Sequence, residues 1–226
     1  MSEFPENSVL VLVPAYNIAA SLPELLPRLR RFVCESNLLF VDDGSTDHTL
    51  QMFEEEGVAF LRFRQNRGKG AALKAGFKYA VEHGYRSVLT IDADLQHLPE
   101  EIPAFYALDD GRSIILGTRA MSGPEMPPQR RLSNFLTSLL VSVFSTRRVR
   151  DSQCGFRLIP TRLLSEIKLQ ADDYDIEADL LFKAGALGWP MIELPITTIY
   201  HGEATYIRPI PDTFRFIRLM WRRIWL

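Results

Sequence analysis

The chain has 226 residues, of which 46% are hydrophobic and 24% charged, and its formal net charge is -2. This length suits one large domain or two small ones, and the balanced charge excludes a global polycation, so we expect no nucleic-acid partner. The two cysteines, Cys34 and Cys154, lie far apart without a CxxC pattern, which argues against a disulfide scaffold or zinc site and fits a reducing cytosol.

The first half of the chain alternates between apolar runs and amphipathic segments. The apolar runs predict strands over residues 8–14, 38–43, 58–63, 87–94 and 113–118. The apolar spacing between them predicts helices over residues 21–33, 46–56 and 70–83, and a further helix that opens at Pro99. Pro27 is awkward inside the first of these helices. Short strands that are apolar throughout and alternate with helices predict a doubly wound α/β sheet, mostly parallel, whose ligands bind at the carboxyl ends of the strands.

The second half differs in composition. A Pro-rich loop over 122–129 is followed by a predicted helix over 131–146 that is apolar almost all round. Such a helix must be buried, and a core position, a membrane surface and a dimer contact all remain open. The N-terminus lacks the pattern of a signal peptide, and no apolar run reaches the roughly 20 residues of a membrane-spanning helix.

The last residues predict a basic amphipathic helix over 211–226, with Trp221 and Trp225 on its apolar side. This combination is typical of an interfacial membrane anchor, and the alternative is a terminal helix docked on the domain. We therefore expect a single catalytic domain over 1–210, with a nucleotide-binding half (1–119) and an acceptor half (120–210), followed by this helix.

The stretch IDADLQH places two carboxylates and an amide at the end of the fourth predicted strand. Residues i and i+2 of a strand point to the same face, so Asp92 and Asp94 are expected to converge, and Gln96 can join them. Their oxygens suit Mg²⁺ or Mn²⁺, and a diphosphate would complete the coordination. The alternative is that Asp94 only caps the next helix.

The stretch VDDGSTDHT repeats this arrangement at the end of the second predicted strand. Asp42 and Asp43 could accept hydrogen bonds from a nucleoside base or ribose, although a strand–turn–helix connection explains much of the motif. The stretch VPAYN would form the other wall, with the ring of Tyr16 offered to a base.

The stretch NRGKGAALKAG is a glycine-rich, basic loop that opens a helix. Its backbone N–H groups and helix dipole favour an anion, and Arg67 and Lys69 add positive charge. The loop lacks the P-loop pattern, and Leu73 stands where the dinucleotide fingerprint requires its third glycine. We therefore expect neither P-loop ATP hydrolysis nor NAD binding.

These motifs, with ILGTR, resemble in this order the family 2 glycosyltransferases of the GT-A fold. The later stretches RRLSN, DSQCGFRLIP and YDIEADLL are similar to the polyprenyl-phosphate branch, which includes dolichol-phosphate mannose synthases. The resemblance implies inverting transfer of a hexose from a nucleotide sugar, of the UDP-glucose or GDP-mannose type, to a lipid phosphate, with Mg²⁺ or Mn²⁺ as the cofactor.

Matching motif to motif, the resemblance also implies sets of site residues. The nucleotide-sugar set comprises Pro14, Ala15, Tyr16, Asp42, Asp43, Gly68, Lys69, Asp92, Ala93 and Arg119. The metal set is Asp92, Asp94 and Gln96, and the catalytic set is Asp94, Asp151 and Glu177. The acceptor and phosphate set comprises Arg131, Ser133, Arg157, His201 and Arg208. The last two lie in a loop that departs from the Gly-x-Ser-Lys type sequence of relatives.

The need for a general base depends on the acceptor. A phosphate monoester is largely ionised at neutral pH and needs little help, whereas a hydroxyl requires a base. Asp151 is the first candidate for this role, followed by Glu177 and Asp179, which fit a solvated helix face equally well. The remaining histidines, His48, His83 and His97, are expected at the surface or in turns.

Several functions remain open. The leading hypothesis is a lipid-phosphate glycosyltransferase, peripheral on the cytoplasmic face of the membrane, with a homodimer through 131–146 left open. The alternatives are transfer to a hydroxyl of a growing glycan or lipid-linked oligosaccharide, a nucleotidyltransferase, and a non-catalytic membrane-associated nucleotide-binding subunit.

Overall fold

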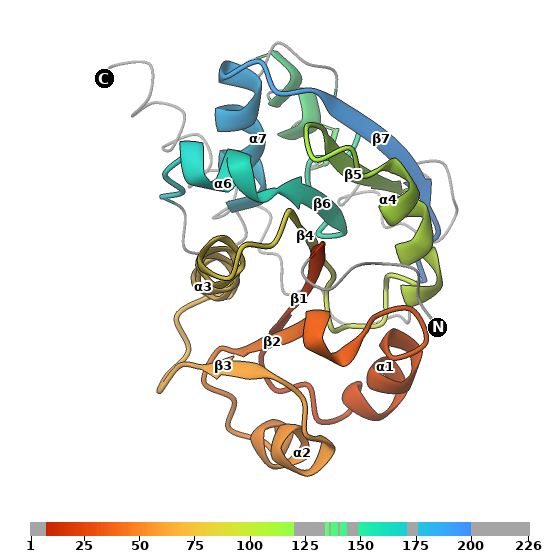
Figure 1. The fold of residues 1–226 in the computed structure, drawn as a ribbon, viewed down its shortest axis with the longest axis vertical. Coiled ribbons are helices and arrows are strands. Elements are labelled where there is room, and N and C mark those ends of the chain that lie inside the picture. The colour runs from red at the N-terminus through yellow and green to blue at the C-terminus, as the bar shows by residue number, and fades with distance from the viewer. Residues whose placement is uncertain are drawn as a thin grey trace.

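A seven-stranded sheet forms the centre of the computed structural model, which describes residues 8–119, 134–135, 137–139, 141–143, 149–170 and 176–199. The strand order is β3-β2-β1-β4-β6-β5-β7 (Figure 1). The strands are β1 (Val9–Ala15), β2 (Leu38–Asp42), β3 (Phe60–Arg62), β4 (Ser87–Thr90), β5 (Ile114–Arg119), β6 (Arg157–Pro160) and β7 (Met191–Ile196). Only β6 runs antiparallel to its neighbours among these strands, which confirms the expected mostly parallel α/β sheet.

Helices cover both faces of this sheet. They are α1 (Leu22–Leu29), α2 (Thr49–Glu56), α3 (Lys69–Glu82), α4 (Ile102–Leu108), α6 (Thr161–Glu166) and α7 (Ile176–Ala186), with short 3-10 turns at Glu35–Asn37 and Pro99–Glu101. One hydrophobic core joins α3, α6 and α7 to the sheet, and a second joins α1, α2 and α4 to its other face. Leu10 and Leu12 of β1 belong to the first core, and Val11 belongs to the second. This alternation explains why the strands read as continuous apolar runs.

The position of α3 is fixed by close packing on β1. A Cβ atom on Gly76 would lie 2.3 Å from Cδ1 of Leu12, so the helix approaches the strand where no side chain intervenes. The first residue of α3, Lys69, follows Gly68, whose φ of 93° is one that side chains with a Cβ rarely adopt. This packing carries the start of α3 to the carboxyl ends of the parallel strands, where a ligand site is expected.

Two boundaries differ from the sequence prediction. The fourth strand, expected to run to residue 94, ends at Thr90, and the chain turns with Leu95 at a φ of 62°. Asp92 and Asp94 therefore lie in a loop. The argument that they converge because they belong to one face of a strand was wrong. The first helix, expected over 21–33, ends at Leu29, with the exposed Pro27 within it.

The second half supplies two strands that the periodicity did not predict, β6 and β7, which complete the sheet. Residues 134, 135, 137–139 and 141–143 are helical, as expected for the described part of the helix over 131–146. No helix within the described ranges is long and apolar enough to cross a membrane. The basic helix expected over 211–226 lies outside the described residues.

Candidate active site

The ammonium group of Lys69 joins two carboxylates at the carboxyl end of the sheet. Its Nζ lies 2.7 Å from Oδ1 of Asp92, in the loop after β4, and 2.9 Å from Oε1 of Glu177, on the first turn of α7. Burial opposes the charge on Lys69, but the two carboxylates outweigh it and raise the pKa of the ammonium group. Three segments that are distant in sequence thus meet at one charged cluster, and all three residues belong to the predicted site sets.

The loop that carries Lys69 is held by a carboxylate from the neighbouring strand. Asp43 accepts hydrogen bonds from the backbone N–H groups of Arg67 (2.7 Å) and Gly68 (2.9 Å). Burial raises the pKa of Asp43, and these two donors oppose the rise. Asp43 was expected to contact a nucleoside; the structure shows that it also shapes the glycine-rich loop.

The loops after β1 and β2 form a second wall beside this cluster. The backbone N–H of Asn17 donates to Oγ of Ser45 (2.9 Å), and Oδ1 of Asn17 accepts from the N–H of Thr46 (2.8 Å). The preceding residue, Tyr16, has 47% of its surface exposed. An aromatic ring on a braced loop is available to a nucleoside base.

Asp42 has a structural position rather than the expected ligand-binding one. It is fully buried, its Oδ1 accepts from the N–H of Ser45 (2.9 Å), and its Oδ2 lies 3.3 Å from Nε of Arg62. Because Asp42 ends β2 with its side chain inside the protein, it stabilises the turn at Gly44 and is not accessible to a nucleotide in this structure.

The residues expected to bind a metal fit a divalent cation that is shared with a substrate. Asp92 already faces the positive charge of Lys69, Asp94 is exposed, and Gln96 is partly exposed. Oδ1 of Asp94 accepts from the N–H of Gln96 (3.0 Å). Within the described part of the chain no group of three or more His, Cys, Asp or Glu residues could hold a metal by itself. Mg²⁺ is commonly bound by one or two carboxylates together with substrate phosphates, so this donor set is suitable.

Arg119 and Asp151 form a buried ion pair close to the cluster. Nε and Nη2 of Arg119 donate to the two carboxylate oxygens at 2.7 and 2.9 Å, and Nδ2 of Asn134 donates to Oδ1 of Asp151 at 3.0 Å. Burial alone would raise the pKa of Asp151, but the hydrogen bonds and charge of Arg119 lower it below its usual range. A carboxylate engaged in this way orients its partners and is poorly placed to take a proton.

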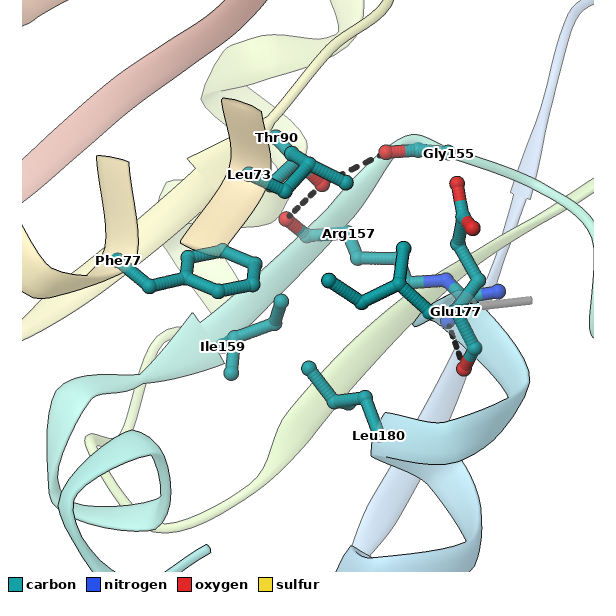
Figure 2. A pocket seen from close by; sticks show the side chains of 9 residues that line it. Leu73, Phe77, Thr90, Gly155, Arg157, Ile159, Glu177 and Leu180 are labelled. Atoms are coloured by element: carbon teal, nitrogen blue, oxygen red, sulfur yellow. Dashed lines mark hydrogen bonds between the residues drawn. The ribbon is translucent and has the colours of Figure 1, made fainter. Parts of the chain in front are cut away.

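Arg157 and Glu177 border a pocket between α3, β6 and α7, with an empty volume of about 260 Å³ that is partly open to solvent (Figure 2). Leu73, Phe77 and Leu180 form its apolar side. Arg157 is buried and donates to backbone carbonyls, including those of Cys154 (2.7 Å) and Glu177 (2.9 Å). The role expected for Arg157 at the acceptor is therefore replaced by a structural one, because it belongs to an interior strand.

Glu177 and Asp179 do not lie on a solvated helix face. They are 8% and 1% exposed, and Asp179 pairs with Nζ of Lys183 at 2.7 Å. Oε2 of Glu177 is buried and has no hydrogen-bond partner in the structure. Buried polar atoms are nearly always satisfied, so this oxygen indicates a missing donor.

His97 was expected at the surface or in a turn; it lies in a loop but is buried, so the surface expectation was wrong. It is 4% exposed, its ring centroid lies 5.5 Å from that of Phe156 in a tilted arrangement, and its Nε2 lies 4.0 Å from Sγ of Cys154. Burial lowers the pKa of His97 to about 4, from an ordinary value of 6.5. The periodicity gave no sign of this burial, because His97 lies in an irregular loop.

This burial predicts a loss of stability in mild acid. The unfolded chain protonates His97 below pH 6.5 and the folded chain only near pH 4, so the free energy of unfolding falls as the pH falls between these values. Between pH 7 and pH 5 the wild type should lose about 2 kcal/mol more than His97→Phe in urea unfolding. Equal losses in the two proteins would contradict the assignment.

The other expected site residues divide into two groups. Pro14 and Ala15 end β1, Gly68 precedes α3, and Ala93 lies between the two acidic residues of the loop after β4. Arg131, Ser133, His201 and Arg208 lie outside the described residues, so their roles stay predictions. Two residues at the site were missed, Asn134 and Gly155. No local pattern pointed to Asn134. Gly155 stands directly before the apolar run of a strand, and a glycine in such a place often marks a close approach of another group.

Comparisons with known proteins identify the family. The profile described as "Glycosyl transferase family 2" matches residues 10–169. The chain is 32% identical to the undecaprenyl-phosphate mannosyltransferase of Micrococcus luteus, over 84% of this chain and 83% of that protein. It is 31% identical to the polyprenol monophosphomannose synthase of Mycolicibacterium smegmatis, over 85% of this chain and 78% of that protein.

A solved structure shares the fold. Glucosyl-3-phosphoglycerate synthase from Mycobacterium tuberculosis, in complex with Mn²⁺, UDP and glucosyl-3-phosphoglycerate, superposes with a TM-score of 0.68 at 21% identity. The match covers 94% of this chain and 76% of that one. The sequence profile, the two relatives and the fold confirm the resemblance seen in the motifs: the chain belongs to glycosyltransferase family 2.

Proposed function

We propose that the protein transfers a hexose from a nucleoside diphosphate sugar to a polyprenyl phosphate, with inversion at the anomeric carbon, at the cytoplasmic surface of a membrane. The bond between the anomeric carbon and the donor diphosphate breaks, a bond to an acceptor phosphate oxygen forms, and the nucleoside diphosphate leaves. The names of the two relatives support a polyprenyl-phosphate acceptor.

The observation that carries the proposal is the cluster of Lys69, Asp92 and Glu177. It places a cation beside the loop expected to bind the diphosphate, where negative charge develops as the sugar leaves. The unpaired Oε2 of Glu177 would accept a hydrogen bond from a substrate hydroxyl. Both features suit a sugar diphosphate, because the cation would face the charged diphosphate and the carboxylate oxygen would face a sugar hydroxyl.

The two walls of the site would bind different parts of the donor. Tyr16 would stack on the base, and Asp43 would hold the glycine-rich loop against the diphosphate. Asp92, Asp94 and Gln96 would hold Mg²⁺ or Mn²⁺, which when bound neutralises charge on the leaving diphosphate. Lys69 stabilises the same charge from the protein side.

The ion pair of Arg119 and Asp151 favours a phosphate acceptor over a hydroxyl. Asp151 accepts from Arg119 and Asn134, Glu177 is paired with Lys69, and Asp179 is paired with Lys183, so each of the three candidate bases already faces a donor. A lipid phosphate brings its own ionised oxygen and needs no base. We assign Asp151 a positioning role: it holds Arg119 at the end of β5.

The proposal of a membrane surface has one structural support. Phe135, Leu139 and Val143 are 59%, 49% and 63% exposed and lie at intervals of four residues, on one side of a helical stretch. Apolar residues exposed along one helix face suit contact with lipid or a second copy. Lipid is the proposed occupant, together with the basic segment 211–226.

The proposal predicts donor binding that depends on the cation. Thermal shifts should be measured with UDP-, GDP- and dTDP-sugars, each with Mn²⁺ or EDTA. One nucleotide class should raise the melting temperature only with Mn²⁺, because a ligand of the folded state stabilises by mass action. The donor found in this way should then transfer labelled sugar to polyprenyl phosphate in detergent, releasing one nucleoside diphosphate per sugar.

The other functions give different outcomes in the same experiment. Release of pyrophosphate would indicate a nucleotidyltransferase. Transfer to a glycan hydroxyl but not to the lipid phosphate would indicate the second acceptor class. Donor binding without transfer or donor hydrolysis, across a broad acceptor panel, would indicate a non-catalytic subunit and would refute the proposal.

A further inference from the structure

The carboxylate of Asp92 lies against the backbone of Gly155. A Cβ atom on Gly155 would lie 2.5 Å from Oδ2 of Asp92, 3.0 Å from its Cγ and 3.1 Å from its Oδ1. Such distances are too short for non-bonded atoms, so a larger residue and the present position of Asp92 exclude one another. Gly155 is not among the glycines with positive φ, so backbone conformation does not explain its presence.

Hydrogen bonds restrain the backbone at Gly155 from moving away from Asp92. Its carbonyl accepts from Oγ1 of Thr90 at 2.6 Å (Figure 2). The neighbouring carbonyl of Cys154 accepts from Nε of Arg157 at 2.7 Å. Arg157 opens β6, which pairs with β4 on one side and with β5 on the other. A methyl group at position 155 would therefore displace the short Asp92 side chain and not the strand.

Displacement of Asp92 would change the charged cluster. Asp92 is fixed on its other side by Lys69, 2.7 Å from Oδ1, and Lys69 is shared with Glu177. An Asp92 carboxylate turned away from Gly155 would lose its ion pair with Lys69 and the orientation that faces a cation.

We propose that Gly155 is a positioning residue of the donor site, whose missing side chain creates the space that the Asp92 carboxylate occupies. It acts through Asp92 and touches no substrate. The consequence for donor binding rests on the proposed function, whereas the steric relation between the two residues does not.

A double-mutant cycle on melting temperature tests the steric relation in the full chain. Gly155→Ala should lower the melting temperature of the wild type by about 2–8 °C, as overpacking does in a protein of this size. In an Asp92→Ala background the same substitution should change it by less than about 1 °C, because the opposing atoms are gone. Equal losses in both backgrounds, or no loss in the wild type, would overturn the proposal.

Nucleotide binding tests the functional consequence. With Mn²⁺ present, Gly155→Ala should weaken binding of UDP or GDP, whichever the wild type binds, by at least about tenfold. Gly111→Ala is the matched control, because its φ of 67° disfavours any side chain and an added Cβ atom would meet Cδ of Arg86 at 3.3 Å, in the loop before β5 and away from the cluster. It should change the melting temperature and leave nucleotide affinity within about twofold.

The two measurements separate the possible failures. Nucleotide affinity that stays unchanged in Gly155→Ala would overturn the positioning role. A wild type that binds no nucleotide would refute the proposed function, and the melting-temperature cycle would still decide whether Gly155 makes room for Asp92.

Discussion

Asp92→Asn should lower kcat/KM for sugar transfer by about 10²–10³-fold, the range seen when one preorganised electrostatic group is removed from an active site. The amide keeps the shape of the side chain but removes the charge that faces Lys69 at 2.7 Å and would face the cation. Lys69 would then retain Glu177 alone as its acidic partner within this cluster. Steady-state kinetics with varied donor and Mn²⁺ would measure the effect.

The matched control for this substitution is Asp110→Asn. Asp110 is exposed and, among the residues that the structure describes, accepts hydrogen bonds from Arg112 and Ser113 of its own turn. Its substitution should leave kcat/KM within about twofold, as expected for a surface position remote from the chemistry. If kcat/KM of Asp92→Asn stays within about threefold of the wild-type value, the assigned role is ruled out, because that role requires a loss of about 10²-fold or more.

Arg119→Met should lower the free energy of unfolding at pH 7 by about 3–5 kcal/mol, because it leaves the Asp151 carboxylate buried without its cationic partner. The double variant Arg119→Met/Asp151→Leu should recover much of this loss, since apolar groups can replace a buried ion pair at little cost. Urea unfolding of the wild type and of both variants would measure the difference.

The loss of unfolding free energy in Arg119→Met should also depend on pH. The pKa of Asp151 is lowered in the wild type, so its contribution to stability is present above the pKa of the unfolded chain and disappears as the pH falls through the folded value. In Arg119→Met burial would raise that pKa, so the difference between the two proteins should shrink in acid. Arg162→Met removes an exposed pair with Glu166 and should change stability by less than about 1 kcal/mol.

The sequence was most informative where secondary structure and chemistry depend on local pattern. Strands β1, β2, β4 and β5 were predictable because they are buried on both faces and read as continuous apolar runs, whereas β3 is short and only partly buried. Lys69 and Asp92 were predictable as site residues, because each sits beside a turn at the carboxyl end of a predicted strand.

The contacts between distant segments were not predictable in the same way. No local pattern shows that Glu177 reaches Lys69, or that Asp151 pairs with Arg119, because these partners meet only when β6 and α7 join the sheet. The burial of His97 has the same cause: Phe156 and Cys154, which cover it, come from a remote segment. The hydrophobic period describes one element at a time and carries no information about which elements meet.

The antiparallel strand β6 also determines the order in which the site can mature as the chain is synthesised. Its first residue, Arg157, pairs with Thr90 of β4 and with Leu116 of β5. Strand β5 leaves the ribosome well before β6, so it can join the earlier strands only after the later segment emerges and closes the intervening loop. Closing such a loop costs chain entropy and slows folding. A nascent chain that ends before Gly155 would therefore lack the surface on which Asp92 rests, so the cluster of Lys69, Asp92 and Glu177 could form only after these later segments emerge.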